Sequence, residues 1–195
     1  MAIYAAHRWW LWGGSALVAS TVLEFTFPAY LTDRALLSGI VLGLGLFCFS
    51  FGGGVAQNVF GGALPGTIAT GLLGGWSIAN GLLTMGAPGW VTVTNTPEAG
   101  VITGFARIAV LLVIVLQLGR NERLNRRWRW TPLWAVCIEA AGWVVTQVVL
   151  VNSFGTTGPE ILAVTAWAGF INAAVPIFIG VLGILASQVA ARNEH

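Results

Sequence analysis

The sequence contains little charge and no lysine. Only 8% of its 195 residues are charged, whereas 56% are hydrophobic. A soluble domain carries roughly 25% charged residues, so this chain has too few to cover a water-facing surface. All nine basic residues are arginine, which excludes a lysine Schiff base and therefore a retinal pump built in the usual way. The composition indicates a protein whose outer solvent is lipid.

Motifs for metal, haem or catalysis are also missing. The two histidines, His7 and His195, lie near the ends of the chain, which argues against bis-histidine haem and histidine-rich metal centres. No HExxH, GxSxG or Walker motif occurs. Cys48 and Cys137 do not form a CxxC pair, and both are predicted to be buried apolar thiols. We predict no cofactor, no metal and no catalytic residue, and an intramembrane enzyme is the least favoured function.

The apolar segments predict helices that cross a membrane. Each runs for about 20 residues, which suits a helix spanning a hydrocarbon core of ~30 Å. Only helices or a closed barrel satisfy the backbone in lipid, and the alternation of a barrel strand does not occur here. We therefore predict an all-α polytopic bundle forming a single domain, 1–195. Its six transmembrane helices are predicted at about 9–30, 35–51, 63–85, 101–118, 130–151 and 161–187.

The arginines predict the orientation of the bundle. Cytoplasmic loops are enriched in Lys and Arg, and the segment 120–129 contains five arginines. With six helices and this loop inside, Arg8 and Arg192 also fall inside, while Arg34 falls outside. We expect both termini in the cytoplasm and a multi-pass protein of the inner (plasma) membrane. Since the arginines follow topology, they do not indicate nucleic-acid binding.

Five polar residues are predicted to lie within one part of the helical bundle. At ~1.5 Å per residue, Glu24 and Arg107 each lie about 9 Å below the outer ends of their helices, which suggests that they pair. Asn80 and Gln147 fall in the same outer half, and Asn172 lies near the midplane. A charged side chain within a membrane costs free energy, so a charged residue at such a depth is interpreted first as part of a functional site. These residues predict an outward-facing polar cluster; the alternative is a structural ion pair with scattered interhelical hydrogen bonds.

Glu139 is predicted to differ from the outer residues. It falls in the inner half of the helix at 130–151, where these helix bounds place no basic residue at the same depth. A buried carboxyl without a cation is expected to stay protonated. We therefore interpret Glu139 as a proton-linked group or as a neutral hydrogen-bond donor.

Small and aromatic residues predict how the helices pack. Close approach through small residues is important because lipid provides no hydrophobic drive between helices. The four-residue spacing of a packing face occurs in three pairs, which serve packing within the bundle or dimerisation: Gly39 with Gly43, Gly71 with Gly75, and Gly169 with Ala173. Three tryptophans lie deep in predicted helices and are expected to pack between them: Trp76, Trp143 and Trp167.

The second half of the chain carries a family resemblance. Pro97 precedes the helix at 101–118, an arginine-rich segment follows that helix, and the last helix contains Gly-Phe-Ile-Asn at 169–172 and Ala-Val-Pro at 174–176 before a short basic tail. This layout resembles a family of small bacterial six-helix membrane proteins catalogued as a domain of unknown function. The sequence departs from it by lacking a histidine near the start of the fourth helix and a longer polar loop after the first. The resemblance implies a fold and a topology and adds no site residues.

These features lead to two functional hypotheses. The first is binding or transport of a small molecule or lipid through the outward-facing polar cluster. The second is a structural or accessory subunit of a larger membrane complex. Membrane lipids are the expected partners under both hypotheses, together with a homo-oligomer or a larger complex.

Overall fold

The computed structural model describes residues 2–26, 33–52, 60, 62–86, 97–121, 129–152 and 159–192. Within these ranges the regular structure is entirely α-helical. The six helices are α1 (Ala2–Thr26), α2 (Asp33–Phe51), α3 (Leu64–Gly86), α5 (Pro97–Arg120), α6 (Thr131–Asn152) and α7 (Pro159–Arg192). The predicted all-α class is confirmed, and each predicted helix corresponds to one observed helix. The differences are at the ends: α1 begins earlier, α5 begins at Pro97, and α7 continues through Pro176 to Arg192.

Within the described residues, three helical segments are long and apolar enough to cross a membrane. They are Ala99–Arg120, Thr131–Val149 and Gly169–Gln188, and α2 contributes a shorter apolar stretch, Leu36–Phe51. Their length and composition indicate a membrane-associated protein.

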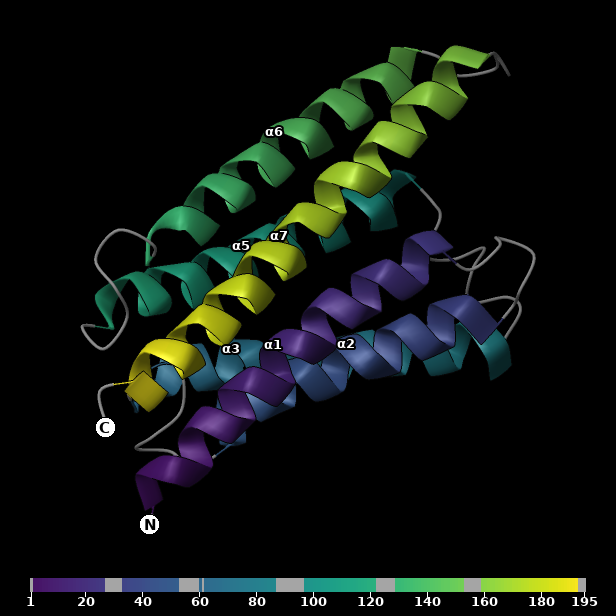
Figure 1. The fold of residues 1–195 in the computed structure, drawn as a ribbon. Coiled ribbons are helices and arrows are strands. Elements are labelled where there is room, and N and C mark those ends of the chain that lie inside the picture. The colour runs from purple at the N-terminus through teal and green to yellow at the C-terminus, as the bar shows by residue number, and fades with distance from the viewer. Residues whose placement is uncertain are drawn as a thin grey trace.

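The helices form a ring in sequence order. Each packs against the next one along the chain, and α7 packs against α1, which closes the ring (Figure 1). Both chain ends lie at one end of the bundle, called here the terminus end (Figure 1). The opposite end, where α1 ends and α5 begins, is called the far end. Successive helices therefore run in alternating directions.

Glycines allow two pairs of neighbouring helices to approach closely. A Cβ added to Gly180 of α7 would lie 2.7 Å from the backbone oxygen of Gly14 in α1. A Cβ added to Gly39 of α2 would lie 2.7 Å from the backbone oxygen of Ser77 in α3, and one at Gly43 would lie 2.8 Å from that of Gly74. The predicted Gly39–Gly43 face thus serves packing within the bundle.

The other two predicted small-residue faces are not used in this way. A Cβ at Gly75 or at Gly169 would meet nothing within 4 Å, and one at Gly71 would meet only Phe51, at 3.6 Å. On α3 the neighbouring apolar side chains Ile68 and Leu72 are also exposed. This part of α3 is an outer surface of the bundle.

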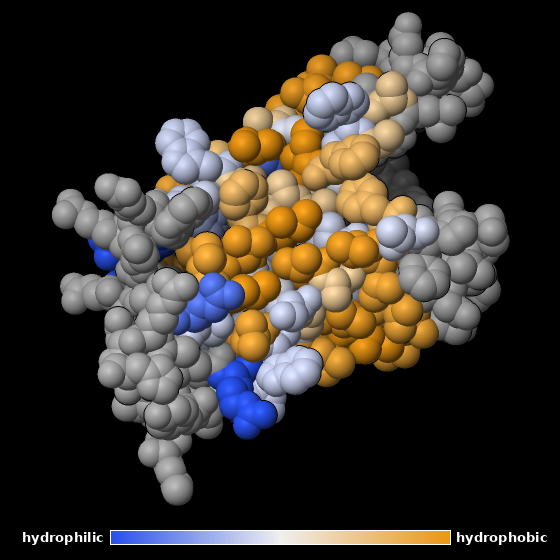
Figure 2. All heavy atoms as spheres, in the orientation of Figure 1, coloured by the Kyte–Doolittle hydropathy of each residue, from blue (hydrophilic) through white to orange (hydrophobic). Residues whose placement is uncertain are grey.

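The hydrophobic core is concentrated toward the terminus end. Its best-buried large members include Phe49 of α2, Ile114 and Leu118 of α5, and Leu17 of α1. Beyond the core, toward the far end, the described Leu, Ile, Val, Phe and Trp side chains are all partly or largely exposed. The space-filling view is indented at this end (Figure 2). The fully buried apolar side chains are therefore concentrated at the terminus end, and those toward the far end are more exposed.

Hydroxyl side chains on the helices bond mainly to their own helices. Each donates to a backbone oxygen three or four residues earlier, which satisfies the hydroxyl without a partner helix. The buried examples are Ser20 and Thr21 to Leu17, Ser50 to Leu46, and Thr70 to Gly66. Each of these four buried hydroxyls therefore has an acceptor within its own helix.

Candidate functional site

An ion pair links α5 and α6 in the described part of the chain. Nε of Arg107 lies 3.0 Å from Oε1 of Glu139. The Glu139 side chain is 2% exposed, whereas the Arg107 side chain is 42% exposed. The pair therefore connects the interior of the bundle with its surface.

Local sequence explains why Glu139 is buried. It follows Ala135 and Val136 at helical spacing, and both of those residues are 1% exposed. The three residues share one face of α6, and that face points into the bundle. The carboxyl is therefore placed on the core-facing stripe of its own helix.

The pair lies at the boundary of the hydrophobic core. Val136 is the last core residue of α6 before Glu139, and Leu111 is the first core residue of α5 after Arg107. Each charged residue is thus about one helical turn beyond the core on its helix. The pair therefore lies where the buried core ends on both helices.

Trp143 covers the next turn on the far side of the pair. A Cβ added to Gly104 would lie 2.7 Å from Cζ2 of Trp143, so the indole lies directly against the backbone of α5. Phe105 packs edge-on against the same indole, with ring centroids 4.8 Å apart. The expectation that Trp143 packs between helices is confirmed. Only a glycine at position 104 leaves room for this ring.

The predicted pairing of Glu24 with Arg107 is wrong. The described contacts pair Arg107 with Glu139, and the Glu24 side chain is exposed on α1. α1 packs mainly against α2 and α7, whereas α5 packs mainly against α3 and α6. A similar depth in two helices does not show whether those helices are neighbours, so it could not identify the partner of Arg107.

The expectation that Glu139 lacks a cation at its depth is also wrong, and the cause is the start of α5. Since α5 begins at Pro97, Arg107 lies about 15 Å below its far end, while Glu139 lies about 12 Å above the start of α6 at Thr131. In a hydrocarbon core of ~30 Å these depths differ by only about 3 Å. The sequence feature that indicates this earlier start of α5 is Pro97 followed by Glu98, because proline is favoured at the first helical position.

The remaining predicted site residues are not gathered around the pair by any described contact. Asn80 is exposed on α3 and has a further interaction, and Gln147 is half-buried on α6. Asn172 lies within α7, but its side chain falls outside the described part of the structure. Of the five residues in the predicted outward-facing cluster, Arg107 belongs to this ion pair, and its partner Glu139 was predicted to lie apart from that cluster.

Two other predictions for single side chains differ from the structure. Trp76 is 46% exposed and Trp167 is 69% exposed, so neither is buried between helices. Cys137, expected to be buried, is exposed, and Cys48 is intermediate. Trp76, Trp167 and Cys137 lie on the outer faces of their helices. Because these helices are apolar on all sides, hydropathy does not distinguish an outer face from an inner one.

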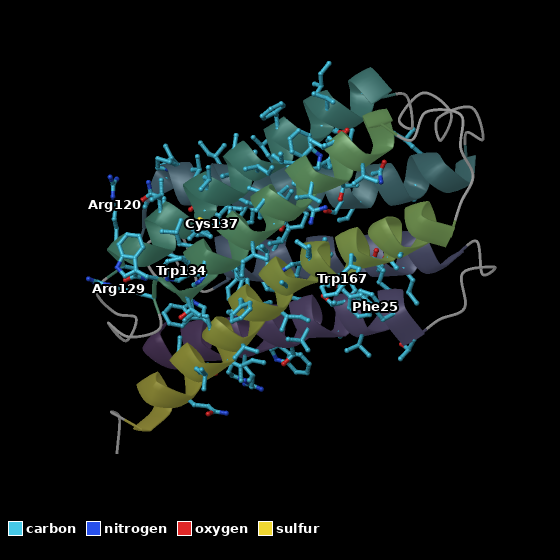
Figure 3. The ribbon with its side chains drawn as sticks, turned by 90° about the horizontal axis from the view of Figure 1, so that it is seen from above. Phe25, Arg120, Arg129, Trp134, Cys137 and Trp167 are labelled. Carbon is cyan, nitrogen blue, oxygen red and sulfur yellow. The ribbon has the colours of Figure 1, made fainter. Side chains whose placement is uncertain are left out.

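The two ends of the bundle carry different side chains. Arg120 and Arg129 lie at the terminus end with Trp134, whereas Phe25 and Trp167 lie at the far end (Figure 3). Phe25 stacks on Phe170 with ring centroids 4.9 Å apart, which ties α1 to α7. The described arginines Arg120 and Arg129 thus make the terminus end basic.

The ion pair combines a cation at the surface with a buried carboxyl. Arg107 presents a permanent cation at the surface, and Glu139 holds it from the interior. Among the described residues no group of three or more His, Cys, Asp or Glu side chains is placed to hold a metal ion. Comparison with known proteins finds no matching family model, no matching curated protein and no matching solved structure.

Proposed function

We propose that this chain is an integral membrane protein that binds or transports a small molecule or lipid, with Arg107 and Glu139 at its site. The observation that carries the proposal is a half-exposed arginine held by a buried carboxyl at the edge of the core. A charge within a membrane costs roughly 2.5–3.5 kcal/mol even on the most lenient scale, so such residues usually serve a function. The Arg107 side chain is 42% exposed, so a ligand at the surface of the bundle can reach it.

In this proposal all six helices span the inner (plasma) membrane, both termini are cytoplasmic and the far end faces outward. The basic terminus end supports this orientation because cytoplasmic segments are enriched in arginine. Single cysteines at positions 95 and 125 in a cysteine-free background test it. An impermeant thiol reagent added outside is expected to label Asn95→Cys and spare Asn125→Cys. The reverse labelling would show the opposite orientation.

Native mass spectrometry of the purified full chain tests the binding site. Wild-type protein released from mild detergent is expected to retain an adduct of defined mass, and Arg107→Gln is expected to lose it. Arg120→Gln is the matched control, because Arg120 lies on the same helix at its terminus end. Equal adducts in all three proteins would remove Arg107 from the site and overturn the proposal.

The alternative function is a structural or accessory subunit of a membrane complex or homo-oligomer. The open surface of α3 around Gly71 and Gly75 favours it, since small residues allow a second helix to approach. Size-exclusion chromatography with light scattering distinguishes the two functions. Replacing both glycines with Leu would reduce the particle mass of an assembly and leave adduct binding at Arg107 unchanged.

A further inference from the structure

We propose that the Arg107–Glu139 pair takes up one anion together with one proton, the anion on the Arg107 guanidinium and the proton on Oε2 of Glu139. This inference rests on the proposed function and specifies the ligand class of the same site. It follows from an unequal use of the two carboxyl oxygens and from the charge balance of a site surrounded by apolar side chains.

The two carboxyl oxygens of Glu139 have different environments. Oε1 lies 3.0 Å from Nε of Arg107. Oε2 is buried and has no hydrogen-bond partner in the described structure. A buried charged oxygen without a donor is unfavourable, since it has lost the hydrogen bonds that water would provide. Oε2 is therefore the position where an added proton is most easily accommodated.

Charge balance couples the proton to an anion. The pair as observed carries no net charge, and an arginine does not lose its proton in proteins. Adding an anion alone would leave the buried site negative, and adding a proton alone would leave it positive. Adding both keeps the site neutral: the proton binds Oε2, the ionic contact at Oε1 weakens, and the guanidinium becomes the partner of the anion. Only this combined step avoids an unbalanced charge in a medium of low dielectric constant.

In the described parts of α5, α6 and α7, the other acidic and basic residues all lie near the ends of the helices. α6 packs against α5 and α7. α5 carries Arg107 near its middle and its other ionisable residues, Glu98 and Arg120, near its ends. α7 has no ionisable residue between its first turn and Arg192, and on α6 itself Cys137 is exposed, two residues from Glu139. The expected stoichiometry is therefore one proton for each monovalent anion.

The surroundings of Arg107 define the body of the ligand. One helical turn from Arg107 on α5 lie Gly104, against which the Trp143 indole packs, and the apolar residues Val110 and Leu111. Apolar groups around a single cation favour a monocarboxylate with an apolar body. Such a ligand has two possible sources, a fatty acid from the bilayer or an aromatic acid from water. Decanoate and benzoate represent them as probes.

Binding of each probe to the full chain in nanodiscs, measured between pH 5.5 and 8, tests the inference. With one proton bound per anion, the affinity of wild-type protein is expected to fall about tenfold per pH unit once Glu139 must be protonated on binding. Glu139→Gln resembles the protonated carboxyl, so it is expected to bind with an affinity independent of pH. Glu139→Asp is expected to retain the pH dependence, and Arg107→Gln is expected to lose binding at every pH.

The outcomes separate this inference from the proposed function. Binding in wild-type protein that is independent of pH, yet lost in Arg107→Gln, would refute the proton and retain the site. Loss of binding in Glu139→Gln with unchanged thermal stability would likewise overturn the inference. Failure of both probes at pH 5.5 would exclude a monocarboxylate, while the adduct in native mass spectrometry would still report on the site. Binding of decanoate alone or of benzoate alone supports the inference and identifies the source of the ligand.

Discussion

Replacement of Gly180 by alanine probes the closest approach between α1 and α7. The added Cβ would lie 2.7 Å from the Gly14 backbone oxygen and 3.0 Å from Cγ2 of Val18. Ordinary contact begins at 3.4 Å, so the Gly14 distance is short by about 0.7 Å. The Gly14 oxygen is backbone and cannot move as a side chain can. The two helices must therefore separate along the face that closes the ring.

Overpacking of this kind costs about 1–3 kcal/mol, whereas alanine gains ~1 kcal/mol over glycine within a helix. The matched control is Gly169→Ala on the same helix, where the added Cβ meets nothing within 4 Å. Gly169→Ala therefore gains the helix propensity of alanine without a steric clash. Gly180→Ala is therefore expected to be about 1–3 kcal/mol less stable than the control, with about 2–4 °C in Tm for each kcal/mol.

Tryptophan fluorescence during heating of the detergent-solubilised protein measures both variants under the same conditions. Equal midpoints for Gly180→Ala and Gly169→Ala would refute the reasoning, because they would show that the backbones of α1 and α7 are not in contact. A lower midpoint for the control would also contradict it, because position 169 would then have a neighbour.

Three further predictions concern the ion pair, the core and the far end. Arg107→Met leaves a buried carboxyl without its cation, so it is expected to lower Tm more than Glu139→Gln does. The free energy of unfolding should fall by at most about 3 kcal/mol, because Arg107 is partly exposed. The double variant Arg107→Met/Glu139→Leu should recover part of this loss in the same heating assay. Phe49→Ala is expected to cost about 3–5 kcal/mol, since Phe49 is 1% exposed, whereas Leu72→Ala, at a position 64% exposed, should change Tm little. A double-mutant cycle of Phe25→Ala and Phe170→Ala should give a coupling of about 0.5–1.5 kcal/mol, and a coupling of zero would mean that the stacked rings do not hold α1 to α7.

The number and type of the helices were predictable because long apolar segments have few structures available in lipid. Their ends were less predictable. The predicted helix begins at Val101, where the continuous apolar segment starts, whereas α5 also includes Pro97 and Glu98. Helix ends depend on backbone capping as well as on hydropathy, so the length of the apolar segment underestimates the length of the helix. Those four residues shifted the estimated depth of Arg107 by about 6 Å.

The partner of Arg107 was not predictable from depth alone. Two carboxyls were available within predicted helices, Glu24 and Glu139, and the choice depended on whether α5 lies beside α1 or beside α6. The ring order of the helices decides it, because α6 follows α5 and packs against it. A preference for consecutive helices as neighbours would have selected Glu139. The outward faces of Trp76 and Trp167 could not be derived, since their helices are apolar on all sides.

The placement of the two charges on consecutive helices has a consequence for biosynthesis. During translation α5 emerges from the ribosome before α6, so for a time its arginine has no carboxylate partner. An isolated arginine is costly to transfer into lipid, whereas the paired hairpin of α5 and α6 carries no net charge at that depth. If α5 and α6 span the membrane as proposed, the insertion machinery is expected to retain α5 until α6 has been synthesised and to release the two as a hairpin. Loss of Glu139 would then reduce the yield of inserted protein before it affected any finished molecule.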